Sequence, residues 1–572
     1  MRSLALLLLA ACAAAAPQTD DPAPRARLRR DMAAAAQAGS LPELAVRGSR
    51  TFTLERAGGS QRPVLTVRTS PTAPPLPVLD EASLGPGASL AWWNPSQDGM
   101  LLAYGVTRPE TGAVELRLRE VGSTMDLPDR ISRVSQGPAA WLPDRTGFYY
   151  ARQAAAAAPP QEAARLRVFF HILGIDPAWD KLVVSTGTSQ DRVDLQVSAD
   201  GGLLLLALRH PSGRSDILAL DRAHPTAGFS ALPAEAAAAR RMVLEGRSLY
   251  LLADPSVAAY QFLALDLRQP SRPRRHRLSI QGPFVAQDFA LLRDGLAVLV
   301  EENGLSRLQL HDRAGRSLRE IPTPGPGGIS ALAADPGHDE VYFVWQSLFA
   351  PPVLCRYDER SSSFSVLSSG PAPDPERFRL RRAEFQAADG TAHALLLASN
   401  SWLKRDGENP VILADLPRAG PTAGPAFSPL LIAWLDAGGL WAAPSPMPRQ
   451  DAAPLLAAAA HWLTQAEYSR PGRIAVLGRG PDARTAAAAA ALEPGLFAAA
   501  VLERPDQDWT PPASFPPALI LSGPSGGAEP PLAKAIDEGT DILAFLLRHM
   551  GLEKAEPPPP PKKLPPKAAK KP

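Results

Sequence analysis

The segment with the clearest chemical pattern is residues 473–497, RIAVLGRGPDARTAAAAAALEPGLF. An apolar run at Ile474–Leu477 predicts a buried strand, Gly478–Asp482 predicts a sharp turn, and the alanines that follow predict a helix. A strand, turn and helix in this order present the attacking serine of many hydrolases, in a G-x-S-x-G turn. Here the central residue is Gly480, which has no side chain to attack a carbonyl. The pattern therefore predicts a serine hydrolase turn without its nucleophile.

A literal G-x-S-x-G sequence occurs further on, at Gly523–Gly527, with Ser525 at its centre. A nucleophilic serine of this kind leads directly into a helix, whereas glycines and prolines delay the next predicted helix to about Leu532. The acid and the histidine follow the serine along the chain in such sites. The single histidine that follows is His549. We therefore interpret Ser525 as part of a glycine-rich turn and keep it as the alternative nucleophile.

The other ionisable residues near these sequences have ordinary structural interpretations. Asp482 stands at the start of the alanine-rich helix, where a carboxylate is expected to cap the first turn. Asp537 and Asp541 lie four residues apart on the last predicted helix, which is typical of a solvated face. His461 falls in a predicted helix and His393 in a predicted strand, and we interpret both as structural.

The spacing of the potential ligand residues predicts neither a cofactor nor a metal site. The nine histidines are scattered, and neither cysteine has a nearby pair of histidines, so no group has the spacing of metal ligands. The sequence GRGPDA carries proline where a phosphate-binding loop offers backbone donors. The net charge of +2 does not favour nucleic-acid binding. The basic run Arg272–Arg275 is interpreted as a solvated strand edge.

Residues 1–12 have the layout of a secretory signal. A basic start precedes the apolar run Leu4–Leu9, which is too short to span a bilayer, and Leu-Ala-Ala then precedes Cys12. This ending resembles a bacterial lipobox, in which the cysteine is lipidated; an ordinary signal peptide with an incidental cysteine is the alternative. Lipid on Cys12 would anchor the chain to a bacterial membrane outside the cytoplasm, on the periplasmic or outer-membrane side. Cys355 would then have no intrachain disulfide partner.

Residues 13–48 are polar and aperiodic, and we expect a flexible tether with one short helix at most. From 49 to 370 the chain repeats an Asp-Gly-like turn before a strongly apolar strand, as in Asp98-Gly99 and Asp200-Gly201. Such repeats, roughly 40–55 residues long, are typical of a β-propeller, and we predict seven blades. The run Ala154–Ala164 is expected to interrupt one blade as a flexible loop.

Residues 371–552 have a different character. Phe378–Ser399 alternates like a hairpin, and then the apolar runs VILADL, PLLIAWLDAGGLWAA, RIAVLG and ALILSG alternate with helices predicted near 452–464, 483–492 and 532–549. Strands interleaved with helices predict a doubly wound, mostly parallel sheet. Residues 553–572 are a Pro/Lys-rich tail that we expect to be disordered.

Together these stretches resemble the prolyl oligopeptidase family of serine peptidases over most of residues 50–552. In the first part the resemblance rests on VLDEASL, NPSQDGMLLAYGV, LREVGSTMDLPDR, AAWLPDRTGFYYAR and VFFHILGIDPAWDKLV. In the second it rests on DGTAHALLLASN, ENPVILADL, FSPLLIAWLDAGGLWA, PGRIAVLGRG and LAKAIDEGTDILAFLLRHMG. The resemblance implies a propeller that covers an α/β-hydrolase domain, shortened in this chain. It also implies a Ser–His–Asp triad that cleaves peptides after proline, with a tyrosine hydroxyl that helps to hold the oxyanion.

On this chain the resemblance assigns each catalytic role to a residue that cannot perform it. The nucleophile falls on Gly480, the oxyanion tyrosine on Leu416 and the histidine on Gly526. A glycine segment of the family is replaced by Pro444–Pro448, and the aspartate loop is missing after Ser522. The substrate-contacting insert is reduced to a few residues within Arg504–Phe515.

We therefore predict a degenerate family member that has lost its peptidase activity. Its function would be to bind a peptide or a protein in the cleft between propeller and hydrolase domain, as a monomeric, lipid-anchored protein of the cell envelope. The alternative is an active serine-type oligopeptidase or other hydrolase with a rearranged active site. A decayed copy without a selected function is a third interpretation, which the intact apolar patterns disfavour.

Overall fold

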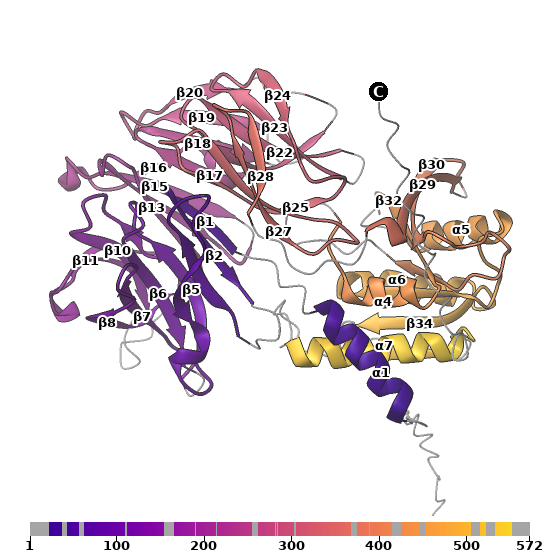
Figure 1. The fold of residues 1–572 in the computed structure, drawn as a ribbon. Helices are drawn as coiled ribbons and strands as arrows, with labels where there is room; N and C mark the ends of the chain where they lie inside the picture. The colour runs from indigo at the N-terminus through magenta and orange to yellow at the C-terminus, as the bar shows by residue number, and fades with distance from the viewer. Residues whose placement is uncertain are drawn as a thin grey trace, which may run out of the picture.

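The chain folds into a propeller-like array of sheets beside a smaller layered domain of helices and strands (Figure 1). The computed structural model describes residues 22–36, 43–56, 62–108, 111–135, 137–153, 165–188, 190–212, 214–253, 261–278, 280, 282, 284–302, 305–367, 375–387, 389–414, 425–445, 452–504, 515–521 and 532–551.

Five sheets of the propeller contain four antiparallel strands each. They are β1 (Glu43–Arg47), β2 (Arg50–Glu55), β3 (Val64–Arg68) and β4 (Leu76–Asp80); β13 (Arg192–Val197), β14 (Leu203–Arg209), β15 (Ser215–Asp221) and β16 (Ser230–Ala231); β17 (Ala239–Glu245), β18 (Ser248–Ala253), β19 (Phe262–Asp266) and β20 (Arg274–Arg277); β21 (Val285–Leu291), β22 (Gly295–Glu302), β23 (Leu305–Asp312) and β24 (Ser317–Ile321); and β25 (Gly328–Ala334), β26 (Glu340–Gln346), β27 (Val353–Asp358) and β28 (Ser363–Val366).

A sixth sheet has eight strands and corrects the prediction of seven separate blades. Its strands are β5 (Ser89–Pro95), β6 (Leu101–Thr107), β7 (Val114–Glu120), β8 (Asp126–Val134), β9 (Ala140–Trp141), β10 (Gly147–Gln153), β11 (Leu166–Ile172) and β12 (Lys181–Thr186). Strand β9 is only two residues long and leaves part of the β10 edge open. β8 pairs there, opposite Arg152, so two successive sets of strands join into one sheet.

The turns between strands explain why the repeating pattern folds in this way. Gly99 and Gly201 have φ angles of 70° and 68°, a backbone conformation that glycine adopts without steric cost. The carboxylate of Asp98 accepts a hydrogen bond from the N–H of Met100 at 3.0 Å, and Asp200 does the same for Gly202 at 2.9 Å. The predicted Asp-Gly hairpin turns are confirmed at both positions.

The first and last sheets of the propeller contact each other and close the ring. The N–H of Gly48 donates to Oδ2 of Asp335 at 2.7 Å, and the guanidinium of Arg68 donates to the carbonyl of Leu367 at 3.1 Å. These hydrogen bonds join residues that are 287 and 299 positions apart in the sequence. The propeller begins with β1 inside the segment expected to be a tether.

The C-terminal domain is built on a seven-stranded sheet of order β29-β30-β32-β31-β33-β34-β35, with the last four pairings parallel. The strands are β29 (Phe378–Gln386), β30 (Ala392–Asn400), β31 (Val411–Ala414), β32 (Leu440–Ser445), β33 (Ile474–Arg479), β34 (Phe497–Glu503) and β35 (Ala518–Leu521). The helices are α4 (Pro429–Asp436), α5 (Ala452–Gln465), α6 (Pro481–Leu492) and α7 (Leu532–His549). The apolar run PLLIAWLDAGGLWAA divides into α4 and β32, and the alanine-rich strand β34 was not predicted.

Helices cover both faces of this sheet, as expected for a doubly wound domain. On one face α5 and α6 pack against alternate residues of the central strands, including Val411, Leu413 and Val476. On the other face α4 and α7 pack against the intervening residues, including Ile412 and Ala475. Successive residues of a strand point to opposite faces, so this alternation buries the strands on both sides.

The N-terminal helix α1 (Pro22–Ala36) packs on α7 and belongs to the C-terminal domain (Figure 1). Met32 is 4% exposed within the core that includes α7. Arg25 donates to Oδ1 of Asp541 at 2.6 Å, and Arg29 donates to Oδ1 of Asp537 at 2.6 Å. These contacts correct two predictions: residues 13–48 are not simply a tether, and the two aspartates form interhelical ion pairs instead of an ordinary solvated face.

Direct contacts also join the propeller to the C-terminal domain. The N–H of Phe427 donates to Oε1 of Gln346, at the end of β26, at 3.0 Å. The rings of Phe349 and Phe378 stack with centroids 5.3 Å apart. Leu348 is buried in the same apolar core as α7.

In the described part of the chain, no helix has the length and apolar character needed to cross a membrane.

Candidate functional site

The turn between β33 and α6 has the predicted strand–turn–helix geometry. Gly480 is the N-cap residue of α6, with φ 54° and ψ −122°. Its N–H donates to the carbonyl of Glu503 at 2.8 Å, which ties the turn to the end of the neighbouring parallel strand β34. A Cβ placed on Gly480 would meet no atom of the described residues within 4 Å, so these residues leave the space in front of the turn open.

Gly478 allows the helix to start close to the strand. A Cβ at Gly478 would lie 2.3 Å from the backbone oxygen of Asp482, and no side-chain movement could relieve that contact. The first glycine of the turn is therefore a packing requirement. Asp482 itself is not the cap that the sequence predicted, because Gly480 occupies that position and α6 has no side-chain cap. Asp482 is exposed in the first turn, where its charge favours the helix dipole.

The charged groups beside Gly480 form an ion pair. Nε of Arg479 lies 2.8 Å from Oε2 of Glu503, a carboxylate whose side chain is 7% exposed. The adjacent Arg504 has φ 53° and lies 3.9 Å from Glu538 of α7. Glu503 is thus held by a guanidinium, and no histidine in the described part of the chain pairs with it.

The three histidines considered from the sequence have partners elsewhere in the C-terminal domain. Nε2 of His461 lies 2.7 Å from Oε2 of Glu493, at the opposite end of α6 from Gly480. That separation is about 18 Å along the helix axis, from the rise per residue. His549 contacts the carbonyl of Phe545 at 2.9 Å. The ring of His393 lies beside that of Phe385, in agreement with a structural role.

The remaining predicted site residues lie outside the described part of the chain. They are Leu416, Ser525, Gly526 and Cys12, together with most of Pro444–Pro448 and the segment Ala154–Ala164. The same holds for residues 553–572. Arg274 and its neighbours in β20 are exposed at the edge of a propeller sheet, as predicted.

Comparison with known proteins identifies the family. The model of the prolyl oligopeptidase N-terminal beta-propeller domain matches residues 19–369, more than half of the 572 residues. The chain belongs to the prolyl oligopeptidase family. It is 20% identical over 371 residues to a prolyl endopeptidase of Elizabethkingia miricola, covering 62% of this chain and 51% of that protein. It is also 20% identical over 384 residues to prolyl oligopeptidase A of Galerina marginata, covering 62% and 52%. The chain thus spans about half the length of these curated relatives.

Solved prolyl oligopeptidase structures share the fold over most of the chain. A structure from a study of inter-domain dynamics in two prolyl endopeptidases has a TM-score of 0.74 and is 18% identical in sequence. The match covers 92% of this chain and 93% of that endopeptidase chain. Prolyl oligopeptidase B of Galerina marginata, bound to a 35mer substrate, has a TM-score of 0.77 at 17% identity, covering 93% and 92%. The likeness includes the layered C-terminal domain, so the turn at Gly480 lies in a hydrolase-like fold.

One buried ionisable group in this family member was missed by the sequence analysis. His171 is fully buried, with Nδ1 2.8 Å from Oδ1 of Asp180 and Nε2 2.9 Å from Oδ1 of Asp129. Tyr150 donates to Asp180 at 2.7 Å, and the N–H of Gly174 donates to Asp129 at 2.7 Å. The arrangement resembles the acid–histidine pair of a catalytic site. Because the imidazole is fully buried and cannot reach a substrate, we interpret it as a structural network. Its partners lie 9 and 42 residues from His171, so no local spacing could reveal it.

The rest of the described chain offers no metal centre: it contains no group of three or more His, Cys, Asp or Glu residues placed to hold an ion. Cys355 is fully buried and reduced. Burial raises the pKa of its thiol to about 12. Cys355 is therefore unsuited to nucleophilic chemistry, which requires a thiolate.

Proposed function

We propose that this member of the prolyl oligopeptidase family has no peptidase activity and binds a peptide or protein ligand instead. The observation that carries the proposal is Gly480 at the point where β33 turns into α6. The resemblance assigns the nucleophile to that position. Acyl transfer by a serine hydrolase needs a hydroxyl there, a histidine to take its proton and donors for the oxyanion. Glycine supplies none of these groups.

The surroundings of Gly480 support this proposal. Two of the charged groups beside Gly480, Arg479 and Glu503, neutralise each other in an ion pair, and the third, Asp482, is an exposed carboxylate in the first turn of α6. His461, on the helix that packs against α6, pairs with Glu493 at the far end of α6. Of the described histidines of this domain, none is therefore placed to act as a general base at the turn. The space that the described residues leave open in front of Gly480 is compatible with a ligand that passes over the turn.

Peptides are the ligand class that the relatives favour. Solved structures of prolyl oligopeptidase B of Galerina marginata are described as bound to a 25mer macrocyclization substrate and to a 35mer substrate. We infer that the present chain binds an extended peptide or a protein segment between its propeller and its hydrolase-like domain. We place this binding at the cell envelope of a bacterium, with the chain a monomer anchored by lipid on Cys12.

The proposal is tested first with a fluorophosphonate probe that labels activated serines, read by intact mass on folded protein. Wild type and Gly480→Ser are both expected to remain unlabelled, because a serine alone lacks the base that activates it. A stoichiometric adduct on the wild type that disappears in Ser525→Ala would instead establish the alternative, an active hydrolase with a rearranged site.

Ligand binding is tested by fluorescence anisotropy with labelled, proline-containing peptides of about 25 residues, the length class bound by a relative. Gly480→Leu should weaken binding because its side chain would enter the open space at the turn. Gly390→Leu is the matched control: Gly390 also has positive φ and open space, but lies in the hairpin between β29 and β30. Equal affinities of the two variants would place the ligand away from the turn and contradict the proposal.

A further inference from the structure

The sheet β17–β20 carries a pocket on its outer part that is separate from the turn at Gly480. The pocket has a volume of about 320 Å³, near the lower limit for small-ligand sites. Its lining residues come from three neighbouring strands and the turns beside them, and they are Arg247, Ser248, Ala264, Asp266, Arg268 and His276. The short side chains of Ser248 and Ala264 leave the space that the longer cationic side chains surround.

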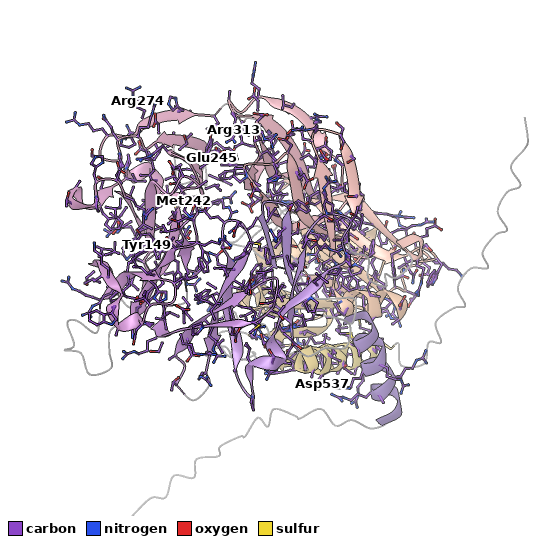
Figure 2. All side chains as sticks on the ribbon, turned by 60° about the vertical axis from the view of Figure 1, so that its left-hand side comes forward. Tyr149, Met242, Glu245, Arg274, Arg313 and Asp537 are labelled. Carbon is purple, nitrogen blue, oxygen red and sulfur yellow. The ribbon has the colours of Figure 1, made fainter. Side chains whose placement is uncertain are left out.

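Strand β20 extends this basic surface at the edge of the sheet. Its four residues, Arg274–Arg277, are all exposed and pair in regular register with β19. Because side chains alternate along a strand, Arg274 and His276 share one face and Arg275 and Arg277 the other. His276 lines the pocket, so Arg274 lies on the pocket face. Figure 2 shows Arg274 at the outer rim of the propeller.

Several side chains on this face have hydrogen-bond donors that no described protein group accepts from at close range. Ser248, Arg274 and His276 make no side-chain hydrogen bond or ion pair in the described chain. Arg268 binds Asp266 through Nε and Nη2, which leaves its Nη1 group available. Arg247 reaches Asp221 only at 3.4 Å and Asp200 only at 3.9 Å.

The acidic groups nearby are already neutralised. Hydrogen bonds from Arg268 lower the pKa of Asp266 to about 2, with a further contribution from the charge of Arg274. On the other face of β20, Arg275 pairs with Glu235 at 3.1 Å. The pocket lining therefore contains one carboxylate, Asp266, which Arg268 pairs. Arg247 also faces Asp221 and Asp200, which are not lining residues.

We propose that this pocket binds the phosphate group of an anionic ligand, either a free phosphate compound or a phospholipid headgroup. A tetrahedral phosphate accepts hydrogen bonds from several directions, which suits donors that converge from different strands. A planar carboxylate is satisfied by a single guanidinium fork, as Asp266 is by Arg268. Arg247, Arg268 and Arg274 supply the charge, and Ser248 and His276 supply further donors.

A basic edge strand alone has a simpler explanation, since charged side chains prevent edge-to-edge pairing of sheets. That explanation requires charge on the edge but no pocket. It applies equally to Arg277, which lies on the same strand and on the opposite face. Arg277 is thus a matched control that has the same charge and exposure but lies away from the pocket.

The test titrates the purified protein with pyrophosphate by calorimetry, and with vesicles of phosphatidylglycerol or phosphatidylcholine by sedimentation. The double variant Arg274→Gln/His276→Gln should weaken binding about tenfold or more, because it removes a charge-assisted hydrogen bond and a second donor. Arg277→Gln should change the affinity less than about twofold, since Arg277 lies on the opposite face of β20 and its side chain does not line the pocket.

The two sources of phosphate give different results. Binding of pyrophosphate without selective sedimentation identifies a free phosphate compound, and selective sedimentation with phosphatidylglycerol identifies a headgroup. If Arg277→Gln and the double variant weakened binding equally, the affinity would depend on the overall positive charge and not on the pocket, and the proposal would be overturned. Absence of binding to both probes at millimolar phosphate would overturn it as well. Peptide binding at the Gly480 turn is an independent measurement and is not expected to change in these variants.

Discussion

The buried imidazole of His171 should make the stability of the propeller depend on pH. Burial opposes the charged form of the ring, but hydrogen bonds with Asp180 and Asp129 outweigh that effect and raise its pKa. The ordinary pKa of an unfolded histidine is about 6.5. A folded pKa above this value means that the stabilisation is fully present below about pH 6.5 and is lost as the pH rises through the folded pKa.

Replacing His171 by leucine would leave two carboxylates in a site with almost no solvent. The side chains of Asp129 and Asp180 are 3% and 2% exposed, and each would retain one hydrogen bond, from Gly174 and Tyr150 respectively. Removing one partner of a buried ionic network costs about 3–5 kcal/mol. For a domain of this size we expect the Tm to fall by about 4–8 °C.

The assay is urea unfolding followed by tryptophan fluorescence at pH 5.5, 7.0 and 8.5. The loss of unfolding free energy in His171→Leu should be larger at pH 5.5 than at pH 8.5. His311→Leu is the control. His311 is also buried, but its ring lies near Gly315 and Gln309, and burial lowers its pKa. Its contribution should be present above about pH 6.5 and be lost as the pH falls through its folded pKa. If the loss in His171→Leu were constant with pH or larger at pH 8.5, the assigned protonation would be refuted.

Three further predictions test packing. Gly478→Ala should destabilise the C-terminal domain by about 1–3 kcal/mol, measured by urea unfolding, because its Cβ would collide with the backbone of Asp482. Met32→Ala should lower the free energy of unfolding by about 2–5 kcal/mol, because Met32 is buried beside Gly539 of α7. It should also make α1 more sensitive to limited proteolysis, and unchanged cleavage would contradict the docking of α1 on α7. Cys355 should react with iodoacetamide only in urea, as judged by intact mass, because burial raises its pKa to about 12; rapid native labelling would show that its sheet opens.

Local sequence patterns predicted those parts of the fold that depend on local interactions. The Asp98-Gly99 and Asp200-Gly201 turns could be predicted because the aspartate side chain bonds backbone groups two residues away. The strand, turn and helix around Gly480 could be predicted because the first glycine and the helix start are within four residues of each other. In both cases the interacting groups are close neighbours along the chain.

The predictions failed where a partner lies far away in the sequence. Helix α1 is rich in arginine and alanine and has few large apolar residues, so its order depends on docking. Its partner is distant in the sequence, since Arg25 and Asp541 are 516 positions apart. The joined eight-stranded sheet depends on how far the short β9 covers β10, which no residue pattern specifies. The network around His171 requires an aspartate 42 residues away.

The conformation of Gly480 links these structural findings to the proposed loss of chemistry. At φ 54° and ψ −122°, a residue with a side chain would carry strain of about 1–3 kcal/mol. A serine hydrolase tolerates that strain because it aims the serine hydroxyl out of the turn. Glycine relieves the strain, while the hydrogen bond to Glu503 and the close approach at Gly478 maintain the turn. A turn that keeps its shape without the strained nucleophile is expected when a domain is retained for its binding surface and not for catalysis.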